Sequence, residues 1–161
     1  MLTDLEAKIR EDFYKDIFPN FESIKKRYKY LWPTLKYELY LRDLKNLDFE
    51  NPKKMIANEP WILGVPIDDI KKKINFLRKC GFKNPTETAE ANIKILDFSI
   101  HSMKGKLKGL SDIGFEFPKK VFISIPKIIC HSTESVRQKI LDLGLDFENQ
   151  EEVIEALSKV L

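Results

Sequence analysis

Three segments of this 161-residue chain align at a spacing of 33 residues: NPKKMIANEPWIL (51–63), NPTETAEANIKIL (84–96) and FPKKVFISIPKII (117–129). Each has a proline in second place and ends in an Ile-Leu or Ile-Ile pair; the prolines are Pro52, Pro85 and Pro118. A repeat of this length is typical of helical units that stack on their neighbours and bury a continuous core. The sequence therefore predicts an all-α helical-repeat solenoid.

A glycine closes each copy. Gly81 and Gly114 keep the 33-residue spacing, whereas Gly144 comes three residues early. In each copy we expect a short helix that begins at the proline and a second helix that ends at the glycine. The early Gly144 predicts a shorter link between the helices of the third copy, or a shorter first turn of its second helix. Asn46 stands where later copies have glycine, and asparagine also tolerates a left-handed backbone.

The spacing divides the chain into N-terminal helices with a loosely matching first repeat, three full copies and a C-terminal capping half repeat. The corresponding ranges are 1–50, 51–83, 84–116, 117–148 and 149–161. A chain of this length can bury about two thirds of its surface, so we expect one compact body.

Three further helices are expected before the repeats. Thr3 and Glu6 form a capping box ahead of a helix that ends at Pro19, and a second helix covers residues 21–31. A third begins at Thr34. It directs three apolar side chains toward the core, those of Leu35, Leu39 and Leu44.

Charge and composition exclude several classes of protein. The net charge is +3 and uneven: residues 51–116 hold 12 basic and 8 acidic side chains, residues 1–50 hold 10 of each, and residues 117–161 hold 6 and 7. No apolar run approaches the 18 or so residues of a membrane span, and no targeting segment is recognisable. Cys80 and Cys130 lack metal-ligand spacing, so we expect buried free thiols in a reducing, intracellular compartment.

The third copy resembles the repeat of the mTERF (mitochondrial transcription termination factor) family. That repeat has an apolar helix, a proline followed by an Ile/Leu pair, a polar N-cap and a helix closed by Leu-Gly-Leu or Leu-Gly-Phe. The matching residues here are Pro126, Ile128-Ile129, Ser132 and Leu143-Gly144-Leu145. The first copy is similar through Pro60 and Gly81-Phe82, whereas the second has Ile93 in place of the internal proline. The resemblance covers about residues 47–161 and implies a left-handed superhelix with a basic groove for duplex nucleic acid.

Lysines recur at two registers of the second helices. Stacked copies would align them in two parallel rows, which could neutralise successive phosphates of a nucleic-acid backbone. The same lysines also fit an ordinary solvated helix face. The residues are Lys71 with Lys104, Lys73 with Lys106, and the neighbouring Lys72 and Lys108.

Another candidate row lies near the N-termini of the first helices, where positive side chains are electrostatically unfavourable. A bound anion would offset this repulsion, although a solvated surface is again the alternative. Arg137 and Lys139 would extend the basic surface onto the third copy. The row itself consists of Lys53, Lys54, Lys119 and Lys120.

All five tyrosines precede residue 41. The segment 25–30 interleaves lysine and arginine with tyrosine, and such side chains can stack on unpaired bases. The alternative, which we favour, is packing: Tyr14, Tyr37 and Tyr40 would cap the end of the array.

No arrangement of residues indicates catalysis. His101 and His131 share a register, but no carboxylate or cysteine pair recurs with them, and no phosphate-binding glycine loop occurs. We therefore predict a non-catalytic nucleic-acid-binding protein without metal or cofactor, acting in transcription or replication. Duplex DNA is the favoured partner, RNA is possible, and no membrane partner is expected. The alternative is a helical scaffold that binds another protein.

Overall fold

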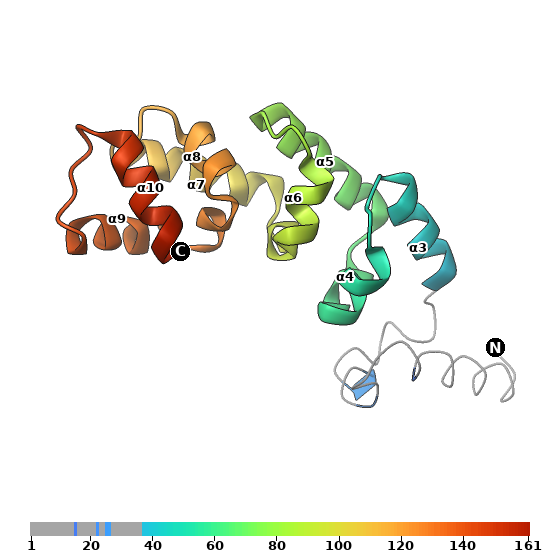
Figure 1. Cartoon of the computed structure of the whole chain (residues 1–161). Coiled ribbons are helices and arrows are strands. Elements are labelled where there is room, and N and C mark those ends of the chain that lie inside the picture. Colours follow the sequence, from blue (N-terminus) through green and yellow to red (C-terminus); the bar gives the residue numbers. More distant parts are fainter. Residues whose placement is uncertain (1–14, 16–21, 23–24, 27–36) are drawn as a thin grey trace, which may run out of the picture. The chain divides into compact units, whose positions relative to one another are not determined.

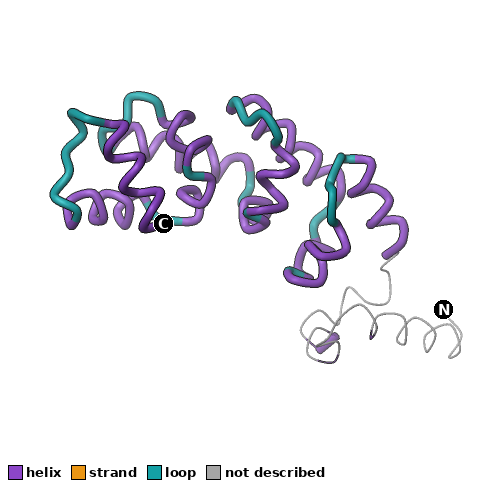
Figure 2. Tube along the Cα trace, viewed as in Figure 1, coloured by secondary structure: helices purple, strands orange, loops and turns teal. Residues whose placement is uncertain are grey.

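The computed structural model of the protein describes residues 15, 22, 25–26 and 37–161. Over these residues the chain forms helices joined by short loops, without a strand (Figure 2). The all-α prediction is confirmed. The helices expected over residues 3–18 and 21–31 lie outside the described residues, apart from isolated positions, as do Thr34 and Leu35.

Contacts group the chain into two compact units, Met1–Asp69 and Ile70–Leu161, where the sequence led us to expect one compact body. The first unit contains α3 (Tyr37–Asn46), α4 (Pro52–Asn58) and the 3₁₀-helix η1 (Pro60–Gly64). Its α4 packs against both α3 and η1. The division between the units falls within α5 (Ile67–Cys80).

The order α-helix, 3₁₀-helix, α-helix, which α4, η1 and α5 follow along the chain, occurs twice more in the second unit (Figure 1). One occurrence comprises α6 (Pro85–Ala91), η2 (Ile93–Asp97) and α7 (Ile100–Asp112). The next comprises α8 (Pro118–Ser124), η3 (Pro126–Cys130) and α9 (Thr133–Asp142), and α10 (Gln150–Val160) follows. Equivalent elements of successive copies touch one another: η2 and η3, α7 and α9, α8 and α10.

The prediction that a helix begins at each of the three prolines is confirmed. The preceding residues adopt nearly the same backbone, with φ of −124° at Asn51, −118° at Asn84 and −122° at Phe117. Proline fixes its own φ and disfavours the helical region for the residue before it, so the helix starts at the proline. At the second helices, Ser99 and Ser132 act as N-caps, because their side chains accept hydrogen bonds from the backbone of Ser102 and Ser135, both at 3.0 Å.

The second helices end as the glycines predict. Gly81, Gly114 and Gly144 have φ of 110°, 122° and 67°. The residue after each glycine donates a backbone hydrogen bond to the carbonyl five positions earlier, as Phe115 does to Leu110 at 3.1 Å.

The prediction for Asn46 is wrong. Asn46 is the last residue of α3, and the left-handed position belongs to Asp48, whose φ is 66°. Asp48 lies 33 residues before Gly81 and therefore holds its register. Phe49 then donates to the carbonyl of Leu44 at 3.2 Å, which closes α3 in the same way as the later helices.

The three-residue deletion in the third copy is also placed differently from the prediction. Ser132 keeps its register as N-cap, so neither the link nor the first turn is shortened. Instead α9 has 10 residues where α7 has 13, and the loop before α10 covers seven residues, 143–149, against five, 113–117, before α8. Removing three residues takes out nearly one turn, so Ile140 still lies on the same face as Val136 and is buried with it.

Each copy buries one apolar face of its second helix together with the apolar pair of its 3₁₀-helix. Ile70, Ile74 and Leu77 of α5 are buried, as are Met103 and Leu110 of α7. Two expectations about buried residues are wrong: Leu39 is 40% exposed, and Cys130 is exposed, although Leu44 and Cys80 are buried as expected. Both cysteines are free thiols.

Candidate nucleic-acid interface

A basic groove lies in the second unit between α5 and α7 and extends to α8. Its volume is about 620 Å³. Lysines form its rim, and its floor is mainly apolar. The rim residues are Lys72, Lys79, Lys104 and Lys119, and the floor includes Phe76, Cys80, Ile100 and Leu107.

Helical spacing explains why these side chains share the groove. Lys72, Phe76 and Lys79 follow the i, i+4, i+7 pattern on one flank of α5. The neighbouring face of α5, with Ile74 and Leu77, is buried in the core. The lysines are therefore held toward solvent by the packing of the face beside them.

The groove concentrates positive charge. Among the residues that the structure describes, no aspartate or glutamate contributes to its lining. Burial raises the pKa of the Cys80 thiol, and the positive charge of Lys119 opposes this rise, so the Lys119 ammonium is near enough to act on the groove floor. A groove lined by ammonium groups over an apolar floor attracts anions.

The structure brings together three of the lysines that the sequence singled out: Lys72, Lys104 and Lys119. It adds Lys79, which the sequence analysis missed. Lys79 has no lysine counterpart one period later, because Asp112 occupies that register. Its position in the last turn of α5, where a cation is favoured, was the signal available.

Lys73 and Lys106 have an intramolecular role. Both are half-buried. The ammonium of Lys73 donates to the carbonyl of Leu96 at 2.5 Å, and that of Lys106 donates to the carbonyl of His131 at 2.8 Å. Lys106 also lies 5.3 Å from the ring centroid of Phe98. Each of these bonds links a second helix to the 3₁₀ segment of the next copy.

The other predicted lysines are spread over several surfaces. Lys71 is exposed on α5, and Lys53 and Lys54 are exposed on α4 in the first unit. Lys108 and Lys120 line a second groove beside α8, and Lys120 pairs with Glu151 at 3.1 Å.

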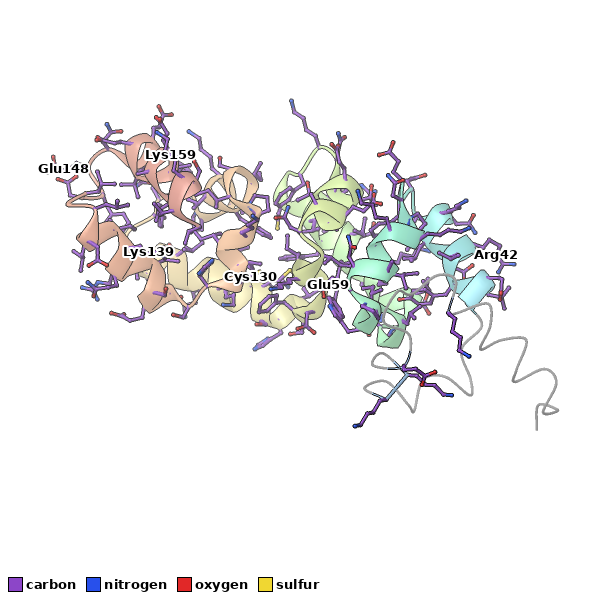
Figure 3. The ribbon with its side chains drawn as sticks, turned by 60° about the horizontal axis from the view of Figure 1, so that its bottom comes forward. Arg42, Glu59, Cys130, Lys139, Glu148 and Lys159 are labelled. Atoms are coloured by element: carbon purple, nitrogen blue, oxygen red, sulfur yellow. The ribbon has the colours of Figure 1, made fainter. Side chains whose placement is uncertain are left out.

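Arg137 and Lys139 lie on α9 in the second unit. Figure 3 labels Lys139, and also Cys130, the last residue of η3. Lys139 is half-buried and Arg137 is exposed. Burial lowers the pKa of His131, and the charges of Lys139 and Lys106 lower it further. Both ammonium groups therefore lie near enough to the His131 ring, which follows η3, to disfavour its charged form.

Tyr40 is half-buried within the first unit. Its hydroxyl lies 2.5 Å from the carbonyl oxygen of Ile62 and 2.8 Å from that of Val65. Burial raises the pKa of this phenol. The hydroxyl thus ties α3 to the end of η1, in agreement with a packing role for this tyrosine.

Within the described part of the chain, no three histidine, cysteine or acidic side chains gather closely enough to hold a metal ion. None of the helices described is long and apolar enough to cross a membrane. Comparisons with protein-family models, with curated proteins and with solved structures found no match to this chain.

Proposed function

We propose that this protein is a non-catalytic nucleic-acid-binding protein, that the basic groove between α5 and α7 meets the phosphate backbone, and that duplex DNA is its favoured partner. The observation that carries the proposal is the set of four lysines around one groove, to whose lining the described part of the chain contributes no carboxylate. Contacts of lysine ammonium groups to phosphate oxygens are sequence-independent, because every nucleotide carries the same phosphate.

The dimensions of the groove suit a polymer better than a single small anion. Lys72 and Lys79 are seven residues apart, which corresponds to about 10 Å along α5 at about 1.5 Å per residue. That distance spans about three base steps of one DNA strand. The rim therefore offers separate contacts to several phosphates.

The resemblance to the mTERF repeat supports the same proposal. It implies that stacked copies form a left-handed superhelix that carries duplex nucleic acid on a basic surface. We accordingly propose a role in transcription or replication, exercised by binding and without a reaction of its own.

The test is the salt dependence of binding to duplex DNA, measured by fluorescence anisotropy. Replacing Lys72, Lys79, Lys104 and Lys119 by glutamine removes up to four phosphate contacts, so the log-log salt slope should flatten by about 3.6. A matched variant removes four lysines outside the groove, Lys45, Lys94, Lys127 and Lys159, and should retain most of the slope. Lys73 and Lys106 are left unchanged in both variants, because they donate to backbone carbonyls.

Two results would overturn the proposal. One is no binding to duplex DNA or to RNA at low salt by protein shown to be folded. The other is an equal loss of slope in both variants, which would indicate diffuse attraction without a defined interface. Duplex RNA in parallel titrations distinguishes the two nucleic acids.

A further inference from the structure

A second groove lies beside the basic one in the second unit, between α7 and α8, and exposes large apolar side chains. Its volume is about 700 Å³. Phe117 is 59% exposed and Ile123 is 39% exposed, and Leu107 lines the groove with them. An exposed aromatic and an exposed aliphatic side chain in one hollow mark a contact surface more often than single apolar residues do.

The repeat unit does not require apolar residues at these two positions. The positions equivalent to Phe117 hold Asn51 and Asn84 in the other copies, and those equivalent to Ile123 hold Ala57 and Glu90. Phe117 is the N-cap residue of α8, a position where asparagine is preferred and phenylalanine is not. The third copy therefore carries a local apolar surface in place of the polar or small residues that the other copies have at these positions.

The rim of this groove is positively charged. Lys108, Lys119 and Lys120 line it, against one carboxylate, that of Glu116. Lys120 already pairs with Glu151, and both side chains are exposed at 59% and 84%. This exposed pair shows the type of interaction that acidic side chains can make here, and a partner's carboxylate could replace it at little cost.

We propose that the groove between α7 and α8 docks an acidic amphipathic helix of a partner protein. Apolar side chains spaced i, i+3, i+4 and i+7 on such a helix would cover Phe117, Ile123 and Leu107, and its acidic side chains would meet the lysines. Nucleic acid fits less well, because its outer surface is dominated by phosphates and offers little apolar area to cover Phe117 and Ile123 together. This proposal does not rest on nucleic-acid binding in the neighbouring groove.

The test uses a fluorescein-labelled, alanine-rich helical peptide of about 15 residues with leucine at i, i+3, i+4 and i+7 and glutamate at about four positions on the flanks of this apolar face. Saturable binding to the full chain is expected by fluorescence anisotropy. The variant Phe117→Asn/Ile123→Ala introduces residues that other copies have at the equivalent positions, so it should fold normally. Its affinity for the peptide should fall at least about tenfold. The same peptide with lysine in place of glutamate should also bind at least about tenfold more weakly.

The proposal would be overturned by any of four outcomes of the peptide and sedimentation measurements. They are no saturable binding, unchanged peptide affinity in the variant with its urea midpoint preserved, equal affinity for the lysine peptide, and a wild-type dimer that the variant abolishes in sedimentation. The last would assign the surface to a second copy of this chain. Duplex DNA provides the remaining comparison: an equal loss of DNA affinity in the same variant would assign the groove to nucleic acid and likewise overturn the proposal.

Discussion

Tyr40 and Lys106 perform the same task 66 residues apart. Tyr40 lies on α3, and Lys106 lies on α7. Each side chain donates a hydrogen bond of 2.8 Å to the carbonyl oxygen of the residue that follows the next 3₁₀-helix: Tyr40 to Val65 after η1, and Lys106 to His131 after η3. Lys73, midway between them, donates to Leu96 near the end of η2. Carbonyls at helix ends lack intrahelical donors, so one register supplies an external donor in three successive copies.

Replacing Tyr40 with phenylalanine should lower the free energy of unfolding by about 1–2 kcal/mol, because the half-buried carbonyls of Ile62 and Val65 lose a donor. Urea denaturation measures the change. Leu39→Met, at the exposed neighbouring position, serves as the control and should stay within about 0.5 kcal/mol of the wild type. Equal stability of the Tyr40→Phe variant and the wild type would show that the bond contributes nothing.

The same bond predicts a pH dependence. Burial raises the pKa of Tyr40, so its neutral form is favoured in the folded state. In the unfolded chain a tyrosine ionises near pH 10, so the contribution of Tyr40 is fully present below about pH 10 and is lost as the pH rises further. The stability difference between wild type and Tyr40→Phe should therefore shrink between about pH 10 and 11. A constant difference across that range would contradict the burial of the phenol.

Lys104 and Lys106 should separate binding from stability. Lys106→Met retains the aliphatic stem but leaves the carbonyl of His131 without its donor, and should cost about 1–2 kcal/mol. Lys104→Met, on the groove rim, should change stability by less than about 0.5 kcal/mol. DNA affinity at fixed salt should fall more in Lys104→Met than in Lys106→Met. If the two variants unfold at the same urea concentration, the assigned roles are wrong.

Gly114 should tolerate substitution less well than Gly144. At Gly114, φ is 122° and an added Cβ would lie 3.0 Å from the ring of Phe147, whereas at Gly144 φ is 67° with no atom within 4 Å. Gly114→Ala should therefore cost about 2 kcal/mol or more, and Gly144→Ala about 1 kcal/mol. Thermal and urea unfolding of the two variants make the comparison, and the reverse order would refute it.

Removing the charge of Lys139 should raise the pKa of His131. Burial and two nearby ammonium groups lower this pKa, and Lys139→Gln removes one of the two. An NMR titration of the His131 ring in both proteins measures the shift. A value that does not move would show that Lys139 is too far away or too well screened to act on the imidazole.

Within residues 51–148, local features of the sequence correctly predicted that a helix begins at each of the three prolines and that another ends at each of the three glycines. A proline, a serine N-cap or a glycine C-cap acts on backbone atoms within a few residues, so its effect can be read without knowing the fold. The error at Asn46 has the same local basis, since both asparagine and aspartate accept a left-handed backbone. Only the 33-residue register, in which Asp48 precedes Gly81, distinguishes Asp48 from Asn46.

One pentapeptide, LDFEN, occurs twice in the chain with different backbone conformations, so its local sequence does not determine its structure. In LDFEN at 47–51, Asp48 is the left-handed residue and Phe49 is buried. In LDFEN at 145–149 the left-handed residue is Gly144, just before the pentapeptide, and the ring of Phe147 lies 5.1 Å from that of Phe115. Both pentapeptides end in the residue before a helix, but the longer loop before α10 shifts the second relative to the helix that precedes it.

The sequence by itself determined the helical repeat, because its capping residues and apolar spacing act within single copies. Only the tertiary structure decided which lysines share a groove. Lysines at equal registers lie on the same flank of successive helices. A groove between two neighbouring helices is instead formed by one flank of the first helix and the opposite flank of the second. Lys72 and Lys79 on α5 therefore face Lys104 on α7, which belongs to another register. Tertiary packing likewise turned Lys73 and Lys106 toward backbone carbonyls, which no spacing along the chain indicates.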